Sequence, residues 1–150
     1  MVVSREEASM ATQTKTLRTG FSQSRYVLSL LRAIVGFTLS FHGAQKLFGM
    51  FGGTDGHGHS VPFLSLMWLA GFIEFFGGWL LVIGLFTRWV AFIACGEMAF
   101  AYFMRHAPRG LWPIMNGGEL AVVYCFVFLY LFAAGPGPVS VDRLIRKREF

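Results

Sequence analysis

Charged residues interrupt the apolar runs of this chain at positions where they could carry chemistry. Glu74 lies inside the apolar stretch from Phe72 to Trp89, and Arg32 and Glu97 interrupt two other apolar runs. Ionisable side chains are costly inside a bilayer, so they face the protein interior, find partners and often mark a functional site. The chemistry available to these three residues is charge pairing, and two carboxylates that share one site can retain a proton.

The helical rise per residue predicts how deep these three groups lie. Counted from the cytoplasmic edge of the membrane, Arg32, Glu74 and Glu97 lie at about 9, 12 and 13 Å. The sequence therefore predicts a buried ion cluster in which Arg32 pairs with Glu74 and Glu97. Such a cluster could serve a function, or it could only fix the register of the helices, and the sequence does not decide between these two roles.

A second group of polar residues is predicted near the outer edge of the membrane, where Glu119 would form a cluster with His42, Lys46 and Arg105. His42, Arg105 and Glu119 lie about 24 to 25 Å above the cytoplasmic edge. We expect this group to bind the polar head of a ligand, because a ligand could enter there from the aqueous side. No residue receives a catalytic role from this pattern. The candidate ligand-binding residues are His42, Gln45, Lys46, Arg105, Asn116 and Glu119.

The two cysteines and a pair of histidines offer weaker signals. Cys95 and Cys125 fall at heights of about 10 and 17 Å, whereas the Cα atoms of a disulfide approach within about 7 Å. We therefore interpret both cysteines as small packing residues rather than as a redox pair. His57 and His59 occupy a glycine-rich loop. Two histidines in such a loop are usually solvated, so we expect no metal site.

The elements that must position these residues are predicted to lie in a membrane. Of the 150 residues, 55% are hydrophobic and 14% are charged, and the mean hydropathy is +0.56. This composition is too apolar for a soluble domain of this size. The formal net charge is +5, and most of the basic residues stand in the two tails. That distribution indicates membrane topology rather than nucleic-acid binding.

Four apolar runs each approach the roughly 20 residues that cross a bilayer. Each run is predicted to be a helix, because lipid offers no partner to an unpaired backbone group. We expect an all-α protein whose domain, residues 25–135, is a transmembrane four-helix bundle with helices at about 26–48, 62–86, 88–104 and 117–134. Residues 1–24 are predicted to be a flexible basic tail, and residues 136–150 a basic amphipathic tail. The basic residues place both termini in the cytoplasm.

Three stretches fill most of the chain between Leu31 and Ile145: LRAIVGFTLSFHGAQKLFG, GFIEFFGGWLLVIGLFTRWVAF and NGGELAVVYCFVFLYLFAAGPGPVSVDRLI. As a set they resemble the DoxX family, with one departure at Val141, where leucine would be expected. The positions that match the family pattern are Arg32, His42, Gln45, Lys46, Glu74, Arg88, Asn116, Glu119 and Asp142.

The resemblance implies a four-helix, multi-pass protein of the bacterial inner (plasma) membrane that acts as an oxidoreductase component. It also implies a relation to the small-subunit machinery of thiosulfate:quinone oxidoreductase, and so to quinone as the cofactor class. Under this hypothesis the outer site binds a quinone or a small anion. The sequence shows no haem-ligand pair or flavin motif, so a soluble or membrane redox partner would supply the electrons.

Two alternatives to the redox role remain open at this stage. The protein could be a non-enzymatic membrane partner that recruits or stabilises a soluble redox enzyme through its basic tails. It could also form a pathway for protons or a small solute, since carboxylates stand at two levels of the predicted bundle. The lipid bilayer is its one partner common to all three hypotheses, and neither substrate nor oligomeric state follows from the sequence.

Overall fold

The computed structural model describes residues 3–146, which are mostly helical. Within that range there is no β-strand, so the predicted all-α class is confirmed. The main helices are α1 (Val3–Phe48), α2 (Leu66–Ile83), α3 (Thr87–Ala101) and α5 (Glu119–Ala134). The shorter ones are η1 (Met50–Gly52), the π-helical turn η2 (Tyr102–His106), η3 (Ala107–Arg109), α4 (Pro113–Asn116) and α6 (Val141–Arg146).

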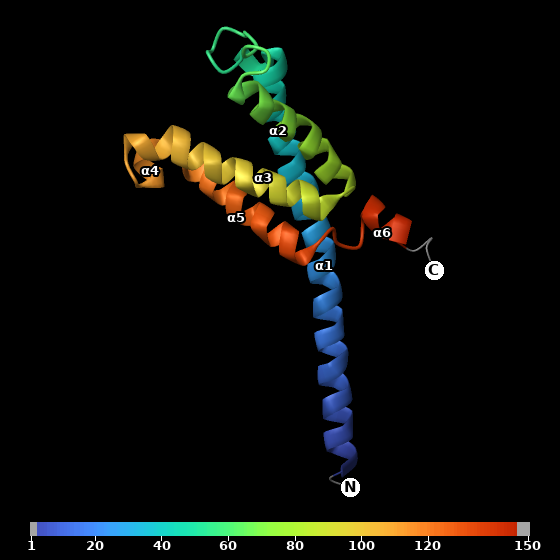
Figure 1. Ribbon diagram of the computed structural model, residues 1–150. Coiled ribbons are helices and arrows are strands. Elements are labelled where there is room, and N and C mark those ends of the chain that lie inside the picture. The colour runs from blue at the N-terminus through green and yellow to red at the C-terminus, as the bar shows by residue number, and fades with distance from the viewer. Residues whose placement is uncertain (1–2, 147–150) are drawn as a thin grey trace.

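The main helices form two antiparallel pairs, α1 with α2 and α3 with α5 (Figure 1). The pairs meet near the short turn between α2 and α3, and from there they lean apart. We call this side of the molecule the turn end. The loop over residues 49–65 and the short helix α4 stand at the far ends of the two pairs, and we call that side the loop end.

Glycines let α1 and α2 approach until their backbones touch. A Cβ atom added to Gly36 would lie 2.7 Å from the carbonyl oxygen of Gly78. One added to Gly43 would lie 2.7 Å from the carbonyl oxygen of Gly71. Small residues are frequent where helices touch in membranes, because they allow this close packing. The two contacts fix the register of α1 against α2, and with it the position of Lys46.

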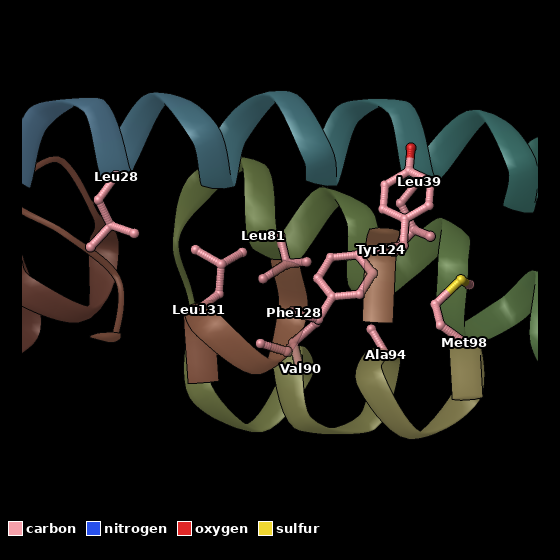
Figure 2. Packing of buried hydrophobic residues seen from close by; sticks show 10 residues of the cluster. Leu28, Leu39, Leu81, Val90, Ala94, Met98, Tyr124, Phe128 and Leu131 are labelled. Carbon is pink, nitrogen blue, oxygen red and sulfur yellow. The ribbon is translucent and has the colours of Figure 1, made fainter. Parts of the chain in front are cut away.

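The apolar core lies where the two pairs face each other (Figure 2). Phe128 and Leu131 of α5 are fully buried there, together with Leu39 of α1 and Leu81 of α2. On α3 the core residue Ala94 is small, which permits a close approach of α5. Because this cluster takes residues from all four main helices, it joins the two pairs.

Helix α1 extends much further towards the N-terminus than the sequence indicated. Residues 3–24 continue α1 as helix, where a flexible tail was expected. The apolar span supplies a ready helical nucleus, and each residue added to it forms one further hydrogen bond. Alanine, glutamate, glutamine, lysine and arginine in this stretch are also good helix formers. Residues 1–2, and 147–150 of the second predicted tail, lie outside the described residues.

The start of α2 is set by a capping residue. The helix begins at Leu66 rather than at residue 62, and the Ser65 side chain accepts a hydrogen bond from the backbone N–H of Trp68 at 3.1 Å. Serine is a preferred N-cap because its oxygen satisfies one of the unpaired N–H groups of the first turn. This later start shortens α2 at its loop end.

The segment after α5 folds back over the turn between α2 and α3 (Figure 1). The carboxylate of Asp142 accepts hydrogen bonds from the backbone N–H groups of Phe86 at 2.8 Å and Thr87 at 2.9 Å. Its own N–H donates to the carbonyl of Gly84 at 2.9 Å. The first N–H groups of a helix have no partner within that helix, so Asp142 caps α3 from a distant part of the chain. We call residues 135–142 the C-terminal latch.

Arg32 binds this latch and not the carboxylates. Its buried guanidinium donates to the carbonyl of Leu81 at 2.8 Å and to the carbonyl of Val139 at 2.5 Å. The predicted pairing of Arg32 with Glu74 and Glu97 is therefore wrong. Carbonyl groups in the last turn of a helix are good acceptors for a cation. The end of α2 offers such acceptors directly beside Arg32.

Two segments of the described chain are long and apolar enough to cross a bilayer. They are Gln23–Phe48, which is the second half of α1, and Leu66–Ile83, which is all of α2. Helix α5 is also apolar but has 16 residues. These lengths and compositions support association with a membrane.

Candidate functional site

An ion pair joins α1 and α2 towards the loop end. The Nζ atom of Lys46 lies 2.5 Å from Oε1 of Glu74, and the Glu74 side chain is only 4% exposed. The sequence placed these residues at different depths, but in the structure Lys46 lies against Gly71, which is one helical turn before Glu74. A lysine stem reaches about one helical turn along a neighbouring helix, which is enough to bring the two charges together.

Glu97 of α3 brings a second carboxylate to this ion pair. It lies close enough to Glu74 and Lys46 for their charges to act on it. In the part of the chain that the structure describes, the buried Oε2 atoms of Glu74 and Glu97 have no hydrogen-bond partner. Two carboxylates beside one ammonium are balanced in charge when they share one proton. We call Lys46, Glu74 and Glu97 the charge cluster.

The charge cluster lies between two cavities. The larger one has a volume of about 380 Å³, and the smaller one about 230 Å³. Lys46 and His106 line both cavities. Glu97 reaches the larger one, whose walls are otherwise mainly apolar, from Leu66, Met67, Phe100 and Met104. Glu74 reaches the smaller one, which Leu39, His42, Met98, Ala121 and Tyr124 also line.

Three of the predicted ligand-binding residues line these cavities, namely His42, Lys46 and Arg105. The His42 ring meets the ring of Tyr124 edge to face, with the ring centroids 6.3 Å apart. Arg105 of η2 stands at the exposed side of the larger cavity. The structure therefore merges parts of the two predicted clusters into one site.

The other three predicted residues line neither cavity. Gln45 donates to the carbonyl of Gly53 at 2.8 Å and so fastens the loop after α1. The buried side chain of Asn116 donates to the carbonyl of Gly110 at 2.6 Å, which holds the turn before α5. Glu119, the first residue of α5, is exposed.

The predicted pairing of Glu119 with the outer basic residues does not occur. Lys46 forms its ion pair with Glu74 instead. The register of α1 against α2 places Glu74 closer to Lys46 than the sequence heights suggested. The α5 helix begins within the second pair, which leans away from α1 towards the loop end (Figure 1). Glu119 therefore remains at the surface.

Comparison with known proteins shows which family the chain belongs to. A sequence model described as DoxX matches residues 27–107, and this stretch contains all three residues of the cluster. The chain belongs to the DoxX family. An uncharacterized protein of Haemophilus influenzae is 40% identical over 130 residues, which cover 82% of this DoxX protein and 93% of that relative. A second uncharacterized protein of the same organism is 34% identical over 68 residues, 45% of each chain. No solved structure matches this DoxX protein.

Two residues that the candidate ligand-binding set omitted complete the walls of the site. His106 lines both cavities, and its Nδ1 atom lies 3.1 Å from the carbonyl oxygen of Asn116, which orients the ring. Tyr124 donates from its hydroxyl group to Oγ1 of Thr38 at 2.7 Å and so ties α5 to α1. A phenol in the middle of an apolar run was a visible signal. The π-helical turn η2, which sets the direction of the His106 side chain, gave no signal in the sequence.

The two cysteines of this DoxX protein face each other, contrary to the sequence heights. The Sγ atoms of Cys95 and Cys125 lie 3.7 Å apart across α3 and α5. The height of Cys125 was counted down from the outer end of its helix across a full membrane thickness. Counted instead from the ends that lie side by side, Cys95 is about 12 Å from Thr87 and Cys125 about 13.5 Å from Ala134. The argument against their proximity is therefore wrong.

In the loop after α1, the side chain of Asp55 contacts both His57 and His59. Nδ1 of His59 lies 2.6 Å from a carboxylate oxygen of Asp55. The backbone N–H of His57, and then the His59 side chain, donate to Asp55 and lower its pKa to about 2. In the described part of this DoxX protein, no three acids, histidines or cysteines are grouped so that they could hold a metal ion.

Proposed function

We propose that this DoxX protein is a multi-pass protein of the bacterial inner membrane, where it binds a quinone as the membrane subunit of an oxidoreductase. Helices α1, α2, α3 and α5 form the four spans, and both termini lie in the cytoplasm. An excess of arginine on the cytoplasmic side is the usual topology signal. Support for this orientation comes from the turn end, where one open cavity is lined by Arg25, Arg88, Arg143 and Arg146.

The observation that carries the proposal is a charge cluster beside a mainly apolar cavity. Ligand sites for apolar molecules combine apolar walls with a few polar groups that fix the orientation. The larger cavity has this character, with Lys46 and Arg105 as donors among methionine, leucine and phenylalanine side chains. A quinone ring is neutral and apolar, and its carbonyl oxygens accept hydrogen bonds from such donors.

The charges of the cluster favour a neutral ligand over a small anion. Glu74 already neutralises Lys46, and Glu97 adds a further carboxylate nearby. An anion such as thiosulfate would find Arg105 at the exposed side of the cavity, but further in it would meet these carboxylates among apolar walls, where like charges repel strongly. Quinone is therefore the better fit of the two ligand classes that the sequence suggested.

The carboxylates also fit the proton balance of quinone chemistry. A bound quinone takes up two electrons and two protons when it is reduced. Glu97 lies at the cavity wall, and its unpaired oxygen is able to hold or pass a proton. Lys46 and Arg105 would orient the quinone oxygens, and the apolar residues would exclude water from them.

Quinone binding by the purified protein tests this proposal. The probe is a short-chain ubiquinone analogue, titrated into protein in nanodiscs while tryptophan fluorescence is recorded. A hydrogen bond to a charged group contributes about 1.5–3 kcal/mol, so Lys46→Met should weaken binding roughly 10- to 100-fold. Glu119→Gln is the matched control, because Glu119 lies outside both cavities. Equal affinity of Lys46→Met and the unchanged protein would refute the assignment.

The helical extension of α1 supports the alternative role as a recruiting partner. Residues 3–22 continue as helix beyond the apolar segment, and they project from the body of the molecule (Figure 1). A soluble redox enzyme could dock on such a helix. Deletion of residues 1–22 would abolish copurification of that enzyme in this case, while quinone affinity would stay unchanged. If the deletion leaves copurification intact, this role for the extension is excluded.

A further inference from the structure

The two cysteine side chains lie close together in the structure, and a pair of thiols can carry two electrons. Cys95 and Cys125 are the two cysteines of the sequence, and they face each other across different helices. Their Sγ atoms, now 3.7 Å apart, need to approach by roughly 1.7 Å to reach the length of a disulfide bond. Small rotations of the two side chains can supply much of this distance. Both residues are half-buried, so neither is sealed in the core.

The sulfur atoms of Cys95 and Cys125 lie next to the smaller cavity, on the side towards the turn end. Met98 of α3 and Ala121 of α5 line this cavity, three residues after Cys95 and four residues before Cys125. Helices α3 and α5 are antiparallel, so both cysteines lie on the same side of the cavity. The separation along the helix axes is about 4.5–6 Å, or one helical turn.

From this placement we infer that Cys95 and Cys125 form a reversible disulfide that passes electrons to a quinone bound at the charge cluster. This inference rests on the proposed function, and it names the electron donor that the quinone site lacks. The sequence suggested that electrons must come entirely from a partner. The structure places a dithiol about one helical turn from the smaller cavity, and Lys46 and His106 line both this cavity and the larger one, where the quinone is proposed to bind.

The reaction balances without any further oxidant. The two S–H bonds of Cys95 and Cys125 break, and one Sγ–Sγ bond forms. Two electrons and two protons leave the thiols, and the quinone takes up both to become a quinol. The carboxylates of the charge cluster lie beside the cavity and can carry these protons. A thiol compound in the cytoplasm or a partner dithiol would reduce the disulfide again.

The first arm of the test asks whether the disulfide forms at all. Protein in nanodiscs is reduced, freed of reductant and oxygen, and treated with the thiol oxidant diamide. The mass of the chain, measured without reductant, should fall by two hydrogen atoms. The protein should stay monomeric, which shows that the disulfide is intramolecular. Cys95→Ser and Cys125→Ser, each with a single remaining thiol, should show no such loss. If the unchanged protein keeps both thiols free, the inference is overturned.

The second arm asks whether a quinone drives the same oxidation. A short-chain ubiquinone analogue replaces diamide, and quinol formation is followed by absorbance in a single turnover. We expect one quinol per chain, matched by one disulfide in the mass spectrum. Lys46→Met should lose at least tenfold in the rate of quinone-driven oxidation but keep oxidation by diamide. Glu119→Gln should keep both reactions.

The two arms separate this inference from the proposed function. If the quinone analogue binds but leaves both thiols reduced, the electron transfer is overturned while the quinone site stands. If the analogue does not bind, the proposed function fails and the electron transfer falls with it. The serine variants should still bind the analogue with unchanged affinity, because the cysteines do not line either cavity.

Discussion

Lys46 and Glu74 form the contact on which the charge cluster depends. Removing one partner of a buried ion pair leaves the other charge without compensation and costs about 3–5 kcal/mol. Because the Lys46 side chain is 18% exposed, we expect Lys46→Met to lower the free energy of unfolding by about 3 kcal/mol. Denaturant unfolding in detergent micelles measures this change.

The double variant Lys46→Met/Glu74→Gln is the control for this prediction. It removes both charges together, so most of the lost stability should return. A double variant that is as unstable as Lys46→Met would show that the ion pair contributes little. The same comparison separates loss of folding from loss of quinone binding, because the double variant folds without the ammonium group that the quinone needs.

Asp55 should remain charged to unusually low pH. The backbone N–H of His57 and the side chain of His59 hold its pKa at about 2, below the ordinary value of 3.8. The stabilisation of the loop by these bonds is thus fully present above the ordinary pKa and is lost as the pH falls through about 2. An NMR titration of the Asp55 carboxyl carbon should show this low midpoint.

His59→Ala tests the cause of that low midpoint. The variant removes the ring donor but keeps the backbone N–H of His57, which is the larger influence on Asp55. The midpoint should therefore rise only part of the way towards the ordinary value. A midpoint near 3.8 in the unchanged protein would contradict the hydrogen bonds of this loop.

At the scale of the helices, the contact between α1 and α2 should not tolerate a single added methyl group. A Cβ atom on Gly36 would lie 2.7 Å from both the Gly78 oxygen and the Leu81 Cβ atom. Overpacking of this kind typically costs about 1–3 kcal/mol, so Gly36→Ala should lower the thermal midpoint. Gly96→Ala is the matched control, because nothing lies within 4 Å of the new atom. It should stabilise the helix by up to about 1 kcal/mol. Equal effects of the two changes on the midpoint would contradict the glycine contact.

The presence of the main helices is easier to predict from sequence than the contacts between them. Apolar runs indicate helices in a membrane because no other open structure satisfies the backbone there. Side-chain contacts depend on register and reach, which composition does not contain. Lys46 contacts Glu74 because the register of α1 against α2 sets it one helical turn away, and Arg32 binds carbonyl groups instead of carboxylates. Which residues belong to the candidate site was thus partly predictable, whereas which charged residues pair with each other was not.

Across the whole molecule, Asp142 of the C-terminal latch connects the end of the chain to the start of α3. Asp142→Asn keeps the size of the side chain but replaces one acceptor oxygen by an amide group. The N–H of either Phe86 or Thr87 then loses its partner, and the loss of such a cap costs about 1–2 kcal/mol. Denaturant unfolding should reveal this difference. Arg146→Gln, at the exposed end of α6, should leave the unfolding free energy unchanged within about 0.5 kcal/mol.

The C-terminal latch also means that two contacts of the fold can form only late in synthesis. Arg32 lies in the segment of α1 that is long and apolar enough to cross a bilayer, yet one of its two carbonyl acceptors belongs to Val139, 107 residues later. Until the ribosome releases that segment, the guanidinium lacks its second acceptor and the first turn of α3 lacks its cap. A nascent chain that stalls before this point would present an incompletely paired buried charge to the proteases of the membrane. Arrival of the latch thus completes both the pairing of Arg32 and the cap of α3.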